Sequence, residues 1–225
     1  MTPSAPPAAV LFDLDGTLIA TRRLYLESFA DALEPVLGRR PPDDWFMERR
    51  PRAEVRFLRE LAGDDHHPAV MERFYRSYEE RHDRDFEGIY PGVEELLAEL
   101  RKLDLPLGIV TGKSRRSWEI TSRRVRLGDF RVRVFDDDVP APKPDPAGLL
   151  RATEALGVRP EEVVYVGDSD SDLLAARAAG ARGAAVLWPK KPHEVEPFRE
   201  LARSLGATVA PSPGDVPRLV GLSPA

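Results

Sequence analysis

The sequence predicts an α/β fold, in which a doubly wound parallel sheet carries a small all-helical domain inserted after its first strand. A short apolar run lies at residues 8–12, strands alternate with helices after residue 90, and residues 21–86 have helical periodicity without a convincing strand. The order of these segments gives a discontinuous α/β core of residues 1–20 and 87–225. Residues 21–86 form the expected helical insertion.

The first strand and the insertion follow from the spacing of apolar residues. The run Ala8–Phe12 is too short for a core helix and stops at an aspartate, so it indicates a buried strand. From Thr21 onward the apolar residues recur at helical spacing, and Gly38 closes the first helix. Two further helices are expected at 52–62 and 68–86 on the same periodicity.

After residue 90 the pattern alternates regularly. Apolar residues such as Val93, Leu96 and Leu100 mark helices, and short runs such as 107–110 mark strands. The expected helices are 92–103, 114–127, 146–156, 170–179 and 193–204, and the expected strands are 107–110, 132–135, 163–166, 184–187 and 208–210.

The composition excludes several classes of protein. The chain has 225 residues, 42% of them hydrophobic, and 33 basic against 38 acidic residues give a net charge of −5, which argues against a nucleic-acid partner. The absence of cysteine excludes disulfides, thiolate metal sites and a cysteine nucleophile. The first apolar run is far shorter than a membrane span of about 20 residues. We therefore expect a cytoplasmic monomer or homodimer with no membrane partner.

Polar residues gather where the predicted strands end. Such sheets bind ligands at the carboxyl ends of their strands. The segments that follow four strands are 13–17, 111–113, 136–143 and 167–172, and three of them contain acids. Clustered carboxylates repel one another unless a cation lies among them, and oxygen ligands without histidine or cysteine favour Mg²⁺. Together with a hydroxyl at Thr111 and a positive charge at Lys143, they predict a phosphate pocket.

These segments carry a resemblance to a known family. The motifs that carry it are Asp13-Leu14-Asp15-Gly16-Thr17-Leu18, Thr111, Lys143-Pro144 and Gly167-Asp168-Ser169-Asp170-Ser171-Asp172. In this order they resemble the four motifs of the haloacid dehalogenase superfamily, whose core is Rossmann-like. The helical insertion resembles the cap of the phosphoglycolate phosphatase-like branch. The likeness spans about residues 8–210.

The resemblance implies catalytic and metal-binding roles. Asp13 would attack phosphorus with one oxygen and bind Mg²⁺ with the other, giving an aspartyl-phosphate. Asp15 would protonate the leaving group and then activate water, and its backbone carbonyl would also bind Mg²⁺. Asp168 would be the third metal ligand. Thr111 and Lys143 would hold the phosphoryl oxygens.

The remaining motif residues are expected around the substrate. Gly16 allows a sharp turn, and Asp172 would orient Lys143 or a metal-bound water. The residues expected to line the substrate are Gly16, Thr17, Gly112, Lys113 and Asp172. Ser169 and Asp170 lie inside the fourth motif with less defined roles.

The second aspartate of the first motif, Asp15, favours phosphoryl transfer, because true dehalogenases of the superfamily lack an acid there. We therefore expect a Mg²⁺-dependent phosphatase of a small phosphorylated metabolite, with the cap as a lid hinged near 18–22 and 84–90. Thr17-Leu18 is more similar to the phosphatases than to a sugar-phosphate mutase. A mutase and a pyrophosphatase stay open, and so does a non-enzymatic phospho-aspartate receiver or binding protein.

Other conspicuous residues have simpler interpretations. The segment Gly108–Ser114 misses the P-loop spacing by one residue, so Lys113 is expected to be solvated at a helix start while still able to line the pocket. The acidic run 136–138 is expected to be a solvated loop. We also expect His66 and His67, and the arginines 49, 50 and 52, to be surface residues, and Trp188 to pack at the end of a strand.

Overall fold

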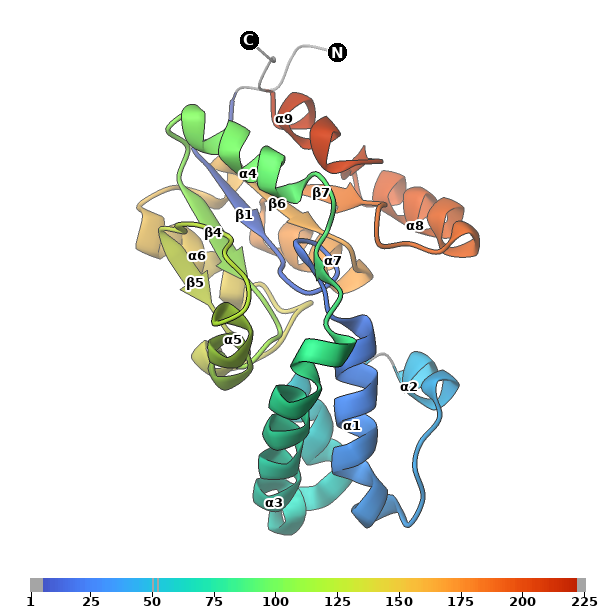
Figure 1. Ribbon diagram of the computed structural model, residues 1–225. Coiled ribbons are helices and arrows are strands. Elements are labelled where there is room, and N and C mark those ends of the chain that lie inside the picture. Colours follow the sequence, from blue (N-terminus) through green and yellow to red (C-terminus); the bar gives the residue numbers. More distant parts are fainter. Residues whose placement is uncertain (1–5, 50, 52, 222–225) are drawn as a thin grey trace.

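A six-stranded parallel sheet forms the centre of the computed structural model, which describes residues 6–49, 51 and 53–221 (Figure 1). Its strand order is β5-β4-β1-β6-β7-β8, so the first strand lies in the middle, with Phe12 opposite Ile109 and Val166. The strands are β1 (Ala9–Phe12), β4 (Leu107–Val110), β5 (Val132–Val134), β6 (Val163–Gly167), β7 (Arg182–Val186) and β8 (Thr208–Ala210). The predicted α/β fold class is confirmed.

Helices cover both faces of this sheet. Val10 and Phe12 belong to the apolar cluster under α4 and α9, whereas Ala9 and Leu11 belong to the cluster under α6 and α7. All four residues are fully buried, which explains why β1 is a continuous apolar run rather than an alternating one. The helices are α4 (Val93–Lys102), α5 (Arg115–Ser122), α6 (Ala147–Leu156), α7 (Asp170–Ala179), α8 (Pro192–Ser204) and α9 (Val216–Leu219).

The three helices between residues 21 and 86 pack on one another, below the sheet in the view of Figure 1. They are α1 (Arg22–Leu37), α2 (Asp43–Arg49) and α3 (Glu54–Asp85), and they share an aromatic core that includes Phe29, Phe46 and Phe74. We call α1–α3 the helical segment. An antiparallel pair, β2 (Ile19–Ala20) and β3 (Gly88–Ile89), joins the two connections between this segment and the sheet.

Several element boundaries differ from those expected. The two helices expected at 52–62 and 68–86 follow each other directly within α3, where the backbone of Gly63 is non-helical (φ 70°, ψ 162°) and separates them by a kink. Helix α2 escaped the sequence analysis, because its apolar residues are adjacent rather than helically spaced. Helix α5 ends at Ser122, five residues earlier than expected. Among the described residues, no helix is both long enough and apolar enough to cross a membrane.

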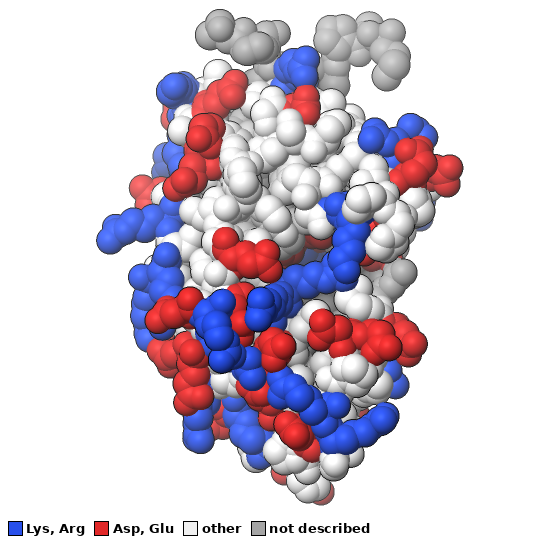
Figure 2. All heavy atoms as spheres, turned by 45° about the vertical axis from the view of Figure 1, so that its right-hand side comes forward, with Lys and Arg blue, Asp and Glu red and all other residues white. Residues whose placement is uncertain are grey.

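The charges of the surface are mixed. On the face turned forward in Figure 2, acidic and basic side chains lie side by side, most densely over the helical segment in the lower half. Ion pairs join α3 to the first turn of α5, through Arg116–Glu72, and to the segment after α5, through Arg124–Asp83. The many charged residues of the sequence therefore give a surface of mixed sign on this face, and not a single basic surface.

Candidate active site

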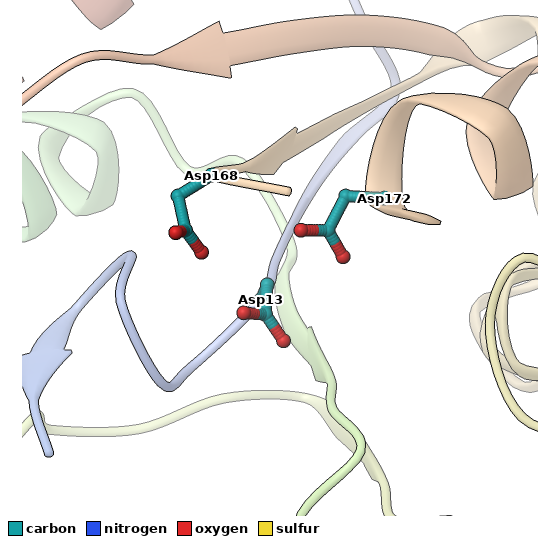
Figure 3. Close-up of side chains that lie close together, drawn as sticks. All are labelled: Asp13, Asp168 and Asp172. Atoms are coloured by element: carbon teal, nitrogen blue, oxygen red, sulfur yellow. The ribbon is translucent and has the colours of Figure 1, made fainter. Parts of the chain in front are cut away.

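Three carboxylates converge at the carboxyl end of the sheet (Figure 3). Asp13 follows β1, Asp168 follows β6, and Asp172 lies in the first turn of α7. An oxygen of each lies within 4.8 Å of an oxygen of the others. Burial raises the pKa of Asp13 well above its usual value, and the negative charges of Asp172 and Asp168 add to this shift, whereas Lys143 opposes it. Burial also raises the pKa of Asp168. The sheet thus holds a crowded acidic cluster at one edge.

Lys143 offsets part of this negative charge. Its Nζ lies 2.7 Å from Asp13 Oδ1 and 2.6 Å from Asp172 Oδ1. Burial opposes the charge of Lys143, but the two carboxylates outweigh it and raise the pKa of Lys143 well above normal. The pKa of Asp172 is lowered despite its burial, because Lys143 and Ser169 donate hydrogen bonds to it. The lysine therefore stays protonated between two acids that differ in proton affinity.

Tyr165 supports this lysine, although the sequence analysis did not select it. Its hydroxyl accepts from Lys143 Nζ at 2.9 Å and donates to the carbonyl oxygen of Val110 at 2.7 Å. The available signal was a single hydroxyl-bearing side chain within the buried apolar strand β6. A buried tyrosine hydroxyl needs a partner, and here the partner is the charged site.

The donor set at this cluster suits a divalent cation. Carboxylate oxygens from three elements face one another, and hard cations such as Mg²⁺ and Ca²⁺ take oxygen ligands. The backbone also leaves no room for other side chains there. A Cβ on Gly16, whose φ is 86°, would lie 2.7 Å from Asp168 Oδ1, and a Cβ on Gly167 would lie 2.5 Å from Asp172 Cβ. Asp13 and Asp168 therefore fit a hard cation, whereas Asp172 accepts hydrogen bonds from Lys143 and Ser169, and the side chain of Asp15 lies outside the triad.

A second lysine, Lys190, lies on the other side of the triad and was also missed. Its Nζ lies 3.1 Å from Asp168 Oδ2. Thr17 Oγ1 lies 3.4 Å from the other oxygen of Asp168, and Trp188 Nε1 donates to the Thr17 carbonyl oxygen at 2.9 Å. Trp188 thus packs at a strand end, as expected. Lys190 follows β7, a strand end that the sequence analysis did not inspect.

Lys113 lies in a different place from the one expected. It is 1% exposed, so its expected solvation is wrong. Its Nζ donates to Tyr25 Oη at 2.6 Å and to Tyr78 Oη at 2.8 Å, and it lies 3.1 Å from Asp15 Oδ1. The loop after β4 directs this side chain toward the helical segment. There the two tyrosines, together with Asp15 of the loop after β1, provide the polar contacts that water would otherwise make.

A cavity of about 680 Å³ connects these groups. It lies between the strand ends and the helical segment. The motif residues that line it are Asp13, Asp15, Gly16, Thr111, Gly112, Lys113, Lys143, Asp168, Ser169, Asp170 and Ser171. Thr17 and Asp172 do not line it; they contact the residues that do. Most of the predicted motif residues therefore line the side of the cavity at the strand ends. The helical segment lines another side through residues such as Tyr25 and Glu54.

Comparison with known proteins identifies the family. The family model described as haloacid dehalogenase-like hydrolase matches residues 10–186. The chain belongs to this family.

Relatives of this haloacid dehalogenase-like hydrolase are phosphatases. The phosphoglycolate phosphatase of Chromobacterium violaceum is 37% identical over 187 residues, covering 79% of this chain and 84% of that protein. The pyrophosphatase PpaX of Bacillus cereus is 35% identical over 184 residues, covering 81% and 84%. A solved structure of a hydrolase from Pseudomonas syringae matches with a TM-score of 0.75 and 27% identity, covering 95% and 97%. The chain is accordingly an enzyme, a hydrolase of the phosphatase type.

The remaining predicted residues lie outside the cavity of this haloacid dehalogenase-like hydrolase. Asp136 is buried and pairs with Arg56 at 3.2 Å, so the expectation of a wholly solvated acidic loop is wrong at this residue. His67 is also buried, with Nε2 3.1 Å from the Val55 carbonyl oxygen, which corrects its expected surface position. His66 is exposed. Both corrections arise from tertiary partners that spacing cannot predict.

The arginines of the insertion are only partly described. Arg49 is exposed, with its guanidinium 3.9 Å from the centre of the Trp45 ring. Residues 50 and 52 lie outside the described part of the chain.

Proposed function

We propose that this chain hydrolyses a phosphomonoester of a small metabolite, with Asp13 as the nucleophile and Mg²⁺ as the metal. The observation that carries the proposal is the position of Lys143 Nζ, 2.7 Å from Asp13 Oδ1, beside a triad of carboxylates in a cavity of about 680 Å³. An ammonium at that point can hold a phosphoryl oxygen while the second oxygen of Asp13 attacks phosphorus. Phosphoryl transfer needs such positioning and charge neutralisation above all.

The reaction would proceed in two displacements. An oxygen of Asp13 forms a bond to phosphorus, the bond from phosphorus to the leaving oxygen breaks, and Asp15 gives its proton to that oxygen. Water then attacks the aspartyl-phosphate, Asp15 takes a proton from the water, and phosphate leaves with Asp13 restored. Asp13, Asp168 and the backbone carbonyl of Asp15 would hold Mg²⁺, which when bound offsets the charge of the phosphoryl oxygens.

Thr111 and Asp172 would assist without reacting. Thr111 is buried, lines the cavity, and its Oγ1 accepts from the backbone N–H of Lys113 at 3.2 Å, so its own hydroxyl proton is free for a phosphoryl oxygen. Asp172 keeps Lys143 beside Asp13. Gly112, in the same loop, lines the cavity without a side chain in the way of the substrate.

The proposed substrate class is a phosphoglycolate-like phosphomonoester, and pyrophosphate is the second candidate. The phosphoglycolate phosphatase of Chromobacterium violaceum supports the first, and the pyrophosphatase PpaX of Bacillus cereus supports the second. Both substrates present a phosphoryl group to the same acids and lysine. They differ in the leaving group, which would face the helical segment.

We further propose that residues 21–86 form a cap domain over a core of residues 1–20 and 87–225. The helical segment has an aromatic cluster of its own, and the β2–β3 pair lies where the chain enters and leaves it. The hinges near 18–22 and 84–90 would let this cap close and exclude water. We also propose a cytoplasmic location, and a monomer or homodimer without nucleic-acid or membrane partners.

The test is phosphate release from a panel of phosphoglycolate, pyrophosphate, a sugar phosphate and p-nitrophenyl phosphate, with Mg²⁺ and with EDTA. We expect Mg²⁺-dependent turnover of at least one natural phosphomonoester. Asp13→Asn should lower kcat by at least about 10⁴-fold, the scale seen when a nucleophile is removed. Asp129→Asn, at an exposed aspartate, is the control. Full activity of Asp13→Asn would reject the nucleophile.

A further inference from the structure

Lys113 is a buried charge for which the proposed reaction has no role. Its ammonium group donates to Tyr25 Oη at 2.6 Å and to Tyr78 Oη at 2.8 Å, and it forms an ion pair with Asp15 Oδ1 at 3.1 Å. These three contacts surround the ammonium group. Although Lys113 borders the cavity, its contacts therefore indicate a role toward Asp15 rather than toward a phosphate.

The hydroxyl groups around Lys113 are themselves oriented. Tyr25 Oη donates its proton to Glu54 Oε2 at 2.7 Å, and the other oxygen of Glu54 accepts from Ser117 Oγ at 2.7 Å. Because the one proton of Tyr25 is used on Glu54, its oxygen can only accept from Lys113. Lys113, Tyr25 and Glu54 therefore form a directed chain of hydrogen bonds, which holds the ammonium group in one position beside Asp15.

The ammonium in turn holds one oxygen of Asp15. Oδ1 accepts from Thr21 Oγ1 at 2.8 Å and lies 3.1 Å from Lys113 Nζ. Within residues 6–49, 51 and 53–221, no group donates to Oδ2, and Asp15 lines the same cavity as Asp13. Two contacts on a single oxygen fix the rotation of the carboxylate and leave the other oxygen for proton transfer.

We propose that Lys113 is a positioning residue, which orients Asp15 toward the leaving group and is itself held by Tyr25 and Tyr78 of the helical segment. The inference rests on the proposed function, because it needs Asp15 as the acid. Lys113 and Asp15 come from loops of the sheet, whereas the tyrosines come from α1 and α3. The acid is thus in place only when the helical segment is docked on the strand ends.

The leaving group of the substrate supplies the test. An alkyl phosphate needs a proton on its departing oxygen, whereas p-nitrophenolate leaves readily without one. We would measure kcat/KM for phosphoglycolate and p-nitrophenyl phosphate with Mg²⁺, since this ratio reports the steps up to departure of the leaving group. Lys113→Met should lower the value for phosphoglycolate by about 100-fold, the scale of a misplaced catalytic group, and change that for p-nitrophenyl phosphate far less.

Two conservative variants keep the test decisive if Lys113→Met does not fold. Tyr25→Phe and Tyr78→Phe each remove one acceptor of the ammonium while keeping the aromatic ring. Each should lower kcat/KM for phosphoglycolate by about 3- to 10-fold, the equivalent of one hydrogen bond, with a smaller change for p-nitrophenyl phosphate. Lys102→Met, at an exposed lysine, is the matched control and should change neither value.

Comparison with Asp15→Asn separates the two proposals. If Asp15→Asn loses phosphoglycolate turnover selectively and Lys113→Met does not, the positioning role is wrong and the proposed function stands. If Asp15→Asn affects both substrates equally, the acid of the proposed function is wrong, and the positioning role fails with it. An equal loss for both substrates in Lys113→Met would also overturn the inference. The double variant should be no slower than Asp15→Asn, because both changes remove the same proton transfer.

Discussion

Two lysines of this molecule, Lys113, which is buried, and Lys143, which is partly buried, lie in contrasting surroundings. Lys143, at the strand ends, lies between the carboxylates of Asp13 and Asp172. Lys113, at the border with the helical segment, donates hydrogen bonds to the hydroxyls of Tyr25 and Tyr78 and pairs with one carboxylate, that of Asp15. The first arrangement balances charge against charge at the place where a phosphoryl group would bind. The second combines one carboxylate, Asp15, with two hydroxyl groups that fix the position of the ammonium group.

Removing the charge of Lys143 should break the first arrangement most severely. Lys143→Met leaves two buried carboxylates without their cation, so the free energy of unfolding should fall by about 3–5 kcal/mol at pH 7. The loss should shrink at acid pH, because the raised pKa of Asp13 lets that carboxyl take up a proton. Urea unfolding at pH 7 and pH 5 measures both effects. A loss below about 1 kcal/mol at pH 7, typical of exposed pairs, would contradict the account.

Metal binding should relieve the same repulsion. Mg²⁺ at about 100 times its dissociation constant should stabilise the fold by about 2.7 kcal/mol, because only the folded chain gathers the triad. Thermal unfolding with Mg²⁺ or with EDTA checks this, and Asp168→Asn should remove most of the shift. An unchanged melting temperature after EDTA treatment would exclude a metal at these acids.

His82 gives the helical segment a titration of its own. It is 1% exposed, and burial, followed by Arg124 and Lys113, lowers the pKa of His82 to about 4. Because the folded-state pKa lies below the unfolded value of about 6.5, the unfolded chain binds more protons as the pH falls from about 6.5 to 4, and stability is lost over that window.

The slope attributable to His82 is about 1.4 kcal/mol per pH unit at most. His82→Phe should flatten the acid side of the stability curve by that amount, whereas His66→Phe, at an exposed histidine, should leave it unchanged. Unfolding free energies measured at about pH 4.5, 5.5 and 6.5 supply the test. An unaltered slope in His82→Phe would assign the acid sensitivity elsewhere.

The smallest expected effect concerns a tyrosine of α3 that does not contact Lys113. Tyr75 Oη donates to Ser114 Oγ at 3.2 Å. Tyr75→Phe should cost about 0.5–1.5 kcal/mol of stability and leave the ratio of phosphoglycolate to p-nitrophenyl phosphate turnover unchanged. A selective loss of phosphoglycolate turnover in this variant would contradict the account. It would show that a hydroxyl without a contact to Lys113 affects the reaction as much as those of Tyr25 and Tyr78.

The same contrast explains what the sequence could predict. Acids and Lys143 follow apolar strands, and parallel strands end at one edge of a sheet, so periodicity and order were enough to bring Asp13 and Asp168 together. The burial of Lys113 could not be predicted in this way. Its partners Tyr25 and Tyr78 fall on the apolar face of helices, where a tyrosine looks like core, and only packing brings their hydroxyls to the loop after β4.

Local signals failed for related reasons elsewhere. Helix α2 has its apolar residues side by side, so it lacks the helical period, and the β2–β3 pair consists of two-residue strands. Tyr165 and Lys190 carry no motif of their own; each acquires its role from the acid that it contacts. A strand end without a motif, such as the one after β7, can therefore also supply a residue of the site.

The central claim is that Asp13 accepts the phosphoryl group, and rapid acid quenching during turnover tests it most directly. Peptide mass spectrometry of the quenched enzyme should find one added phosphoryl group, located on Asp13 and absent from Asp13→Asn. Steady turnover with no phosphorylated peptide, or with the group on another residue, would contradict the account.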